Sequence, residues 1–168
     1  HAAVEFHEIP GAVAYINRGG EEVYHKAFGY KKLEGKIMMQ TGDIFRMASM
    51  TKALTAVSIL QLCERGLLTL DDEVSKYIPA FKDPQILTEI HEDSSFSARP
   101  YEGEITIRQL LSHTSGIGYG FQDERYNALV IKHEISEGFE DDDRTSMENI
   151  LRIAELPLLH APGEKFTY

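Results

Sequence analysis

Two residues that together can carry nucleophilic chemistry stand three positions apart in this sequence, in the stretch Ser49-Met50-Thr51-Lys52. A serine hydroxyl becomes a nucleophile when a neighbouring base removes its proton, and an uncharged lysine amine can be that base. On a helix, residues three apart share one face, so the amine would reach the hydroxyl. Because composition alone produces a Ser-x-x-Lys pattern about once in a few hundred residues, the surrounding helix has to support the assignment.

That helix is predicted over residues 50–65, which contain no Gly or Pro, and Gly66 follows as the residue that ends it. At about 100° per residue, one apolar arc forms that includes Ser49 and Lys52. Its apolar members are Ala53, Ala56, Ile59, Leu60 and Cys63. We therefore expect Cys63 to be a small buried core residue.

A lysine on the buried face, in the first turn where the helix dipole opposes a cation, breaks two local rules. The functional explanation is that burial lowers the pKa of the Lys52 amine from ~10.4 towards neutrality, which makes it a base. The structural explanation is that the lysine side chain reaches solvent from the end of the helix.

The remaining elements are predicted from local signals. Residues 11–16 and 22–30 are β-type runs joined by Arg18-Gly19-Gly20, which predicts a hairpin. Thr106 with Gln109, and Thr145 with Glu148, have the spacing of capping boxes that open two helices. The second half is thus expected to be mainly helical and rich in loops, and the acidic patch from Glu137 to Asp143 is expected to be a solvated loop and not a metal site.

Composition narrows the function classes. The chain has 168 residues, 42% of them hydrophobic, which suits one globular domain. Its net charge of -10 would repel nucleic acid and anionic membrane surfaces. No apolar run approaches the ~20 residues of a membrane span, and the N-terminus lacks the order of a signal peptide. The single cysteine leaves the redox compartment open.

Three other patterns in the sequence were considered as possible sites, and none indicates a metal, triad or dinucleotide site. His-Glu pairs begin at His7, His91 and His133, but none continues as His-Glu-x-x-His, so a zinc protease is not indicated. No Gly-x-Ser-x-Gly elbow accompanies His113, so a Ser-His-Asp triad is not indicated either. The glycines of residues 116–120 lack the strand-then-helix context of a dinucleotide site.

Three stretches, in this order, resemble the serine hydrolases of the class C β-lactamase and penicillin-binding protein type, which include carboxylesterases and D-alanyl-D-alanine carboxypeptidases. They are residues 45–52 continuing through 62–72, residues 105–116, and residues 162–168. The resemblance places His113 in a structural turn. It also implies that Tyr168 is the phenol that relays a proton between the nucleophile, Lys52 and the leaving group.

The resemblance implies an α/β fold of the β-lactamase/transpeptidase type, with an antiparallel sheet flanked by helices plus a mostly helical region. Residues 1–168 would form one incomplete domain: an N-terminal hairpin and sheet edge (1–48), the nucleophile helix (49–66) and the helical region ending at the catalytic tyrosine (67–168). The sequence stops at Tyr168, so the C-terminal strands, including the Lys-Thr-Gly type strand, are absent from it. We expect the remaining polypeptide or a second fragment as a partner, and this chain alone to be inactive.

The expected function is a serine hydrolase that forms an acyl-enzyme on an ester or amide, with catalytic residues Ser49, Lys52 and Tyr168 and no cofactor or metal. The alternative is a non-catalytic domain of the same fold that binds or senses β-lactams or peptides. The lifetime of the acyl-enzyme separates the two. A β-lactam, a peptidoglycan peptide and a small ester all remain open as substrates. The resemblance alone favours a periplasmic or secreted location.

Overall fold

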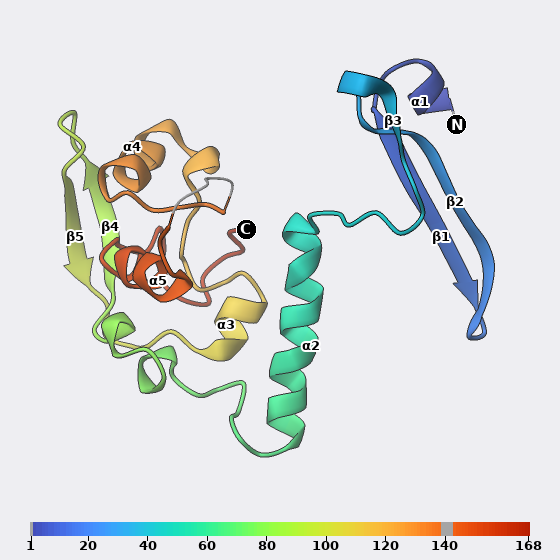
Figure 1. Ribbon diagram of the computed structural model, residues 1–168. Helices are drawn as coiled ribbons and strands as arrows, with labels where there is room; N and C mark the ends of the chain where they lie inside the picture. The colour runs from blue at the N-terminus through green and yellow to red at the C-terminus, as the bar shows by residue number, and fades with distance from the viewer. Residues whose placement is uncertain (1, 139–142) are drawn as a thin grey trace. The chain divides into compact units, whose positions relative to one another are not determined.

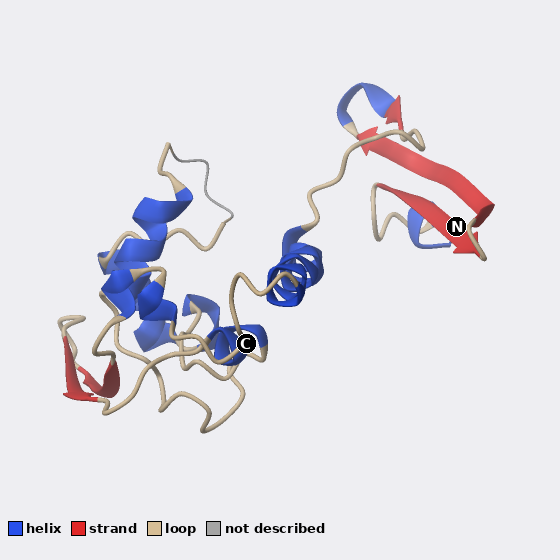
Figure 2. Ribbon diagram, turned by 90° about the horizontal axis from the view of Figure 1, so that it is seen from below, coloured by secondary structure: helices blue, strands red, loops and turns tan. Residues whose placement is uncertain are grey.

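The computed structural model describes residues 2–138 and 143–168 and divides the chain into two compact units, His1–Thr51 and Lys52–Tyr168 (Figures 1 and 2). The units are described separately below. Most of the acidic patch that was expected to be a solvated loop, residues 139–142, lies outside the described residues.

The first unit is built on an antiparallel sheet with the strand order β1-β2-β3. Its regular elements are α1 (Ala2–Glu5), β1 (Gly11–Arg18), β2 (Glu21–Lys32), β3 (Ile37–Met38), and the 3-10 turns η1 (Glu34–Lys36) and η2 (Ala48–Met50). Gly19 and Gly20 connect β1 to β2 with φ of 62° and 88°, which glycine adopts without a steric penalty. The predicted hairpin is confirmed, with both strands longer than the sequence pattern indicated.

The second unit begins with Lys52 and therefore contains almost all of α2 (Thr51–Glu64). The predicted helix is confirmed, and so is its end, because Gly66 takes a φ of 67° and its N–H bonds the Cys63 carbonyl at 2.9 Å. The predicted burial of its apolar arc is wrong. Ala56, Ile59 and Cys63 are only half-buried, and the second unit's own described elements bury no residue of α2.

The rest of the second unit combines short helices with a second hairpin that the sequence analysis did not predict. Its elements are η3 (Val74–Lys76), η4 (Pro79–Phe81), β4 (Gln85–Ile90), β5 (Phe96–Pro100), α3 (Ile107–Leu111), η5 (Gly120–Gln122), α4 (Glu124–Lys132) and α5 (Ser146–Ala154). β4 and β5 pair antiparallel (Figure 1). Both predicted capping boxes are present, at the starts of α3 and α5.

Two apolar clusters form the core of the second unit. In one, Tyr126, Leu129 and Val130 of α4 pack with Leu156 against side chains of the β4-β5 hairpin. In the other, Val74, Phe81, Ile105 and Leu158 pack against Ile150, Ile153 and Ala154 of α5. These clusters fix the framework on which the loops of residues 112–120 and 157–168 rest.

Two further observations concern residues 2–138 and 143–168. No helix among them combines the length and apolar character needed to cross a bilayer. Within the same residues, no three histidine, cysteine, aspartate or glutamate side chains gather into a group that could hold a metal ion.

Candidate active site

Ser49 lies in the first unit, within the 3-10 turn η2 that directly precedes α2. The residue before it, Ala48, has a φ of 45°, in the left-handed region that residues with a Cβ rarely adopt. Such a conformation costs on the order of 1–3 kcal/mol and persists only where the surroundings impose it. The candidate nucleophile is therefore presented by a strained turn at the start of a helix.

Lys52 and Tyr168, the first and last residues of the second unit, lie together. The Lys52 Nζ is 4.9 Å from the centroid of the Tyr168 ring and 6.0 Å from that of Tyr119. The two tyrosine rings are stacked at 6.1 Å between centroids, with 16° between their planes. The structure thus brings together two of the three predicted site residues, whereas Ser49 belongs to the other unit and is linked to Lys52 through Met50 and Thr51.

Tyr168 reaches this position because the end of the chain pairs with the segment that follows α3. The Leu159 N–H donates to the Gly116 carbonyl at 2.7 Å, Gly163 to Thr114 at 2.7 Å, and Thr167 to His113 at 2.8 Å. Gly116 has no alternative at its position, since a Cβ there would lie 2.4 Å from the His160 carbonyl oxygen. The pairing therefore sets the last residues against residues 113–116.

Two histidines contact the last residues of the chain, 166–168. The His113 ring lies 4.9 Å from the Tyr168 ring and 5.7 Å from the Phe166 ring, and its backbone lies in a turn after α3, as expected. His160 is 3% exposed; its Nδ1 is 2.9 Å from the Ala161 carbonyl and its Nε2 is 2.8 Å from the Thr167 hydroxyl. Because a carbonyl only accepts, Nδ1 donates, and in the neutral ring Nε2 accepts from Thr167.

The electrostatics of Lys52 correct the expectation of a lowered pKa. The pKa of the Lys52 amine lies above its ordinary value, first because of a hydrogen bond with Tyr168; partial burial opposes this, and Tyr119 adds to it. Lys52 is only partly buried as a residue and its amine has two phenols as neighbours, so desolvation does not dominate. The sequence argument assumed burial of this helix face; it named Tyr168 only through the family resemblance and did not identify Tyr119.

Tyr119 is the site residue that sequence reasoning missed. The sequence analysis considered residues 116–120 only for their glycines, although the aromatic Tyr119 lies between Gly118 and Gly120. A Cβ on Gly118 would lie 2.5 Å from the Leu159 side chain, so the loop packs closely there. The signal available in the sequence was an aromatic residue flanked by glycines, because glycine allows such a loop to pack closely.

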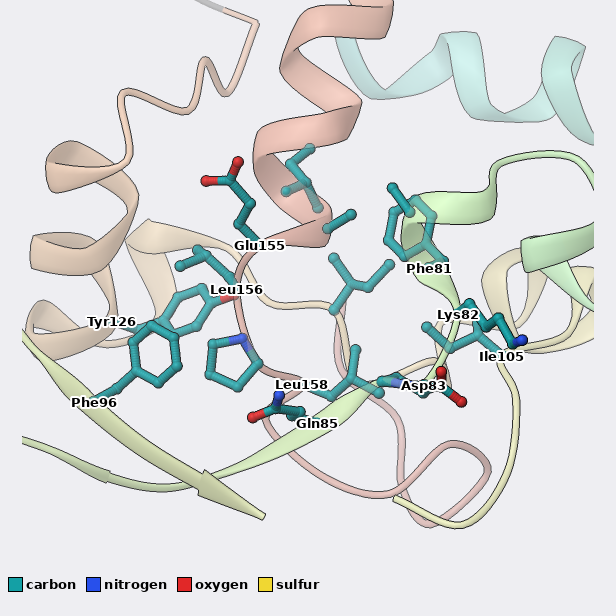
Figure 3. A pocket seen from close by; sticks show the side chains of 16 residues that line it. Phe81, Lys82, Asp83, Gln85, Phe96, Ile105, Tyr126, Glu155, Leu156 and Leu158 are labelled. Carbon is teal, nitrogen blue, oxygen red and sulfur yellow. The ribbon is translucent and has the colours of Figure 1, made fainter. Parts of the chain in front are cut away.

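A cavity of about 320 Å³ elsewhere in the second unit is a separate feature (Figure 3). It lies between η4, the start of β4 and the end of α5, with Phe81, Ile105 and Leu158 in its wall. Neither Lys52, Tyr119 nor Tyr168 lines it. Its wall is part of the core, and the candidate chemistry lies elsewhere.

Comparison with known proteins finds relatives that match most of this chain. The chain is 36% identical over 166 residues to esterase EstB of Burkholderia gladioli, covering 99% of this chain and 39% of the relative. It is 34% identical to acyltransferase calJ of Penicillium decumbens, covering 89% and 34%. Among solved structures, EstCE1, a hydrolase with promiscuous acyltransferase activity, matches with a TM-score of 0.82 at 30% identity, covering 99% and 40%.

The chain thus spans about two fifths of the length of esterase EstB and of EstCE1. Its antiparallel sheets flanked by helices have the β-lactamase/transpeptidase fold that the resemblance implied. The family model described as Beta-lactamase matches residues 1–168. A match over the whole chain, together with these relatives, shows that the chain belongs to the Beta-lactamase family.

Proposed function

We propose that the intact protein is a serine hydrolase that forms an acyl-enzyme on Ser49 from an ester substrate. The observation that carries the proposal is the contact of the Lys52 ammonium with Tyr168, because it couples a lysine one helical turn beyond a serine to a phenol that can pass a proton. The family membership supports the same chemistry.

In the proposed reaction the Ser49 oxygen attacks the ester carbonyl carbon while its proton passes to the phenolate oxygen of Tyr168, which the Lys52 ammonium stabilises. When the tetrahedral intermediate collapses, the bond to the alcohol oxygen breaks and Tyr168 gives that oxygen a proton. Water then attacks the acyl-enzyme by the reverse sequence of proton transfers and releases the acid. Because the raised pKa of Lys52 keeps its amine protonated at neutral pH, the amine cannot accept the Ser49 proton; the ammonium instead stabilises Tyr168 as the phenolate that accepts it.

Acyl transfer to an alcohol is the second candidate, and the relatives favour it specifically. One is named an acyltransferase and another a hydrolase with promiscuous acyltransferase activity. Both reactions share the acyl-enzyme and differ only in whether water or an alcohol attacks it. Among ester, β-lactam and peptide substrates we propose an ester, because these relatives are named an esterase and an acyltransferase.

A labelling experiment tests the proposal. A fluorophosphonate probe is expected to label the intact protein, and p-nitrophenyl acetate to be turned over with release of free enzyme. Ser49→Ala should abolish both. Ser58→Ala is the matched control, because Ser58 lies on α2, the helix that follows the turn of Ser49, and its hydroxyl donates to the Leu54 carbonyl at 2.9 Å. Labelling that survives Ser49→Ala would overturn the assignment, and a stable acyl-enzyme without turnover would indicate a sensing domain.

A further inference from the structure

His160 is a buried polar side chain that the proposed reaction does not use. The residue is 3% exposed, and a buried imidazole is costly unless its nitrogens have hydrogen-bond partners. Both nitrogens have one: Nδ1 lies 2.9 Å from the Ala161 carbonyl and Nε2 lies 2.8 Å from the Thr167 hydroxyl. A neutral ring therefore satisfies both of its nitrogens within the last nine residues of the chain.

A tight turn brings Thr167 back to His160. At this turn the Glu164 N–H donates to the Ala161 carbonyl at 3.0 Å, and the Glu164 carboxylate accepts from the Ala161 N–H at 3.2 Å. Gly163, inside the turn, has a φ of 86°, which favours glycine. Two side chains seven positions apart in the chain therefore meet at one hydrogen bond.

Thr167 is held at two atoms, one of its backbone and one of its side chain. Its N–H donates to the His113 carbonyl at 2.8 Å, and its hydroxyl donates to His160 Nε2 at 2.8 Å. Because threonine is branched at Cβ, a fixed hydroxyl restricts its side chain to one rotamer and ties its backbone to the buried ring. Hydrogen bonds are directional, whereas the ring contacts of Tyr168 with His113 and Tyr119 are of a kind that is favourable over about 4.5–7 Å between centroids. The bond between His160 and Thr167 therefore restricts the position of Tyr168 more closely than the ring contacts do.

We propose that His160 is a positioning residue, which acts through Thr167 to hold the Tyr168 phenol at the Lys52 amine. The inference rests on the proposed function, in which Tyr168 transfers the protons. An apolar ring would fill the same buried space, and a satisfied hydrogen bond adds little net stability. What the imidazole adds is an acceptor at a fixed point, which selects one position for the end of the segment that carries Tyr168.

The first measurement is the pKa of Lys52 in the intact protein, followed by NMR of the methylene carbon beside Nζ. That pKa is raised chiefly by the hydrogen bond with Tyr168, so it reports whether the phenol is in place. His160→Phe keeps a ring but removes the acceptor, and should lower the pKa of Lys52 towards its value in Tyr168→Phe. His133→Phe is the matched control and should leave it unchanged, because His133 is a half-buried histidine of the same unit whose ring pairs with Glu155 at 3.5 Å.

The second measurement is the hydrolysis of methyl acetate by the intact protein. Thr167→Val leaves the buried ring untouched and removes only the hydroxyl, because valine has the shape of threonine. Thr167→Val and His160→Phe should each lower kcat by about 10- to 100-fold, the loss that a misplaced group produces, with little change in KM. The double variant should lose no more than the greater single loss, because both changes remove the same bond. His160→Gln should restore part of kcat, because its side-chain oxygen can accept from the Thr167 hydroxyl.

Two sets of outcomes separate this inference from the proposed function. An unchanged pKa of Lys52 or an unchanged kcat in folded Thr167→Val would overturn the role of His160, and so would a double variant in which the two losses multiply. Absence of any ester hydrolysis, or hydrolysis that survives Ser49→Ala, would instead refute the proposed function. In that case a lowered pKa of Lys52 in Thr167→Val would still support the link from His160 to Tyr168.

Discussion

At the scale of single residues, the chemistry of Lys52 depends on which neighbour dominates its environment. A lysine that is desolvated loses its proton easily, whereas one that donates to a phenol oxygen holds it. The structure places Lys52 in the second situation, since its hydrogen bond with Tyr168 outweighs partial burial. The protonated lysine is thus prepared to stabilise negative charge on the tyrosine oxygen.

The first prediction concerns this hydrogen bond. Tyr168→Phe removes the largest cause of the raised pKa, so the pKa of Lys52 should fall, and the amine should lose its proton at a lower pH than in the wild-type chain. Tyr119→Phe should lower it less, because Tyr119 contributes smaller effects in the same direction. NMR titration of the Lys52 methylene carbon beside Nζ measures both. An equal or absent shift in the two variants would contradict the assignment.

Sequence could identify Ser49 and Lys52 as candidates because three-residue spacing on a helix is a local property. Tyr168 came only from the resemblance to a family, and Tyr119 was missed. Both tyrosines reach Lys52 through backbone pairing between residues 113–116 and 159–167, which lie more than 40 positions apart in the chain. No local signal reports such a pairing.

At the scale of elements, the structures found correctly were those with their own start and stop signals. The hairpin at Gly19 and Gly20, the helix ended by Gly66, and the two capping boxes all belong to this group. The β4-β5 hairpin was missed because Pro84 and Pro100, which border it, suggested only loop punctuation. Its strands are stabilised by packing under α4, a tertiary effect that propensity does not contain.

The second prediction concerns α4, whose Tyr126 packs over this hairpin. Burial raises the pKa of Tyr126 to about 12. The unfolded phenol titrates near 10, so between about pH 10 and 12 the unfolded state releases the proton first and folding stability falls as pH rises. The loss should approach about 1.4 kcal/mol per pH unit from this residue. Urea unfolding at pH 9 and 11 measures it, and Tyr126→Phe should remove that part of the dependence; an identical slope in the variant would contradict the prediction.

At the scale of the whole molecule, burial is distributed unevenly between the two units. Every residue of the described chain that is buried belongs to the second unit, where the two apolar clusters lie. No described residue of the first unit is buried, although Tyr15, Ile16 and Val23 are large apolar residues of its sheet. A small sheet of this kind has little apolar burial to offset the entropy of ordering its chain.

The last prediction follows from this distribution. In the 168-residue chain studied by itself, the amides of β1 and β2 should exchange with deuterium by local opening, because their hydrogen bonds have no buried side chains above them. The amides of α4 and of Leu158, which lie over or within the buried clusters, should open only with the unfolding of the second unit. Protection in the hairpin should be lower by at least about 100-fold, a difference that native-state exchange commonly spans within one protein.

Hydrogen exchange followed by mass spectrometry resolves the two regions in one sample, and a second run with Leu129→Ala provides an internal control. Loss of the 0% exposed Leu129 side chain should lower protection across the second unit and leave the hairpin unchanged. Equal protection in both units, or a matching loss in both on Leu129→Ala, would mean that the 168 residues unfold as one cooperative body.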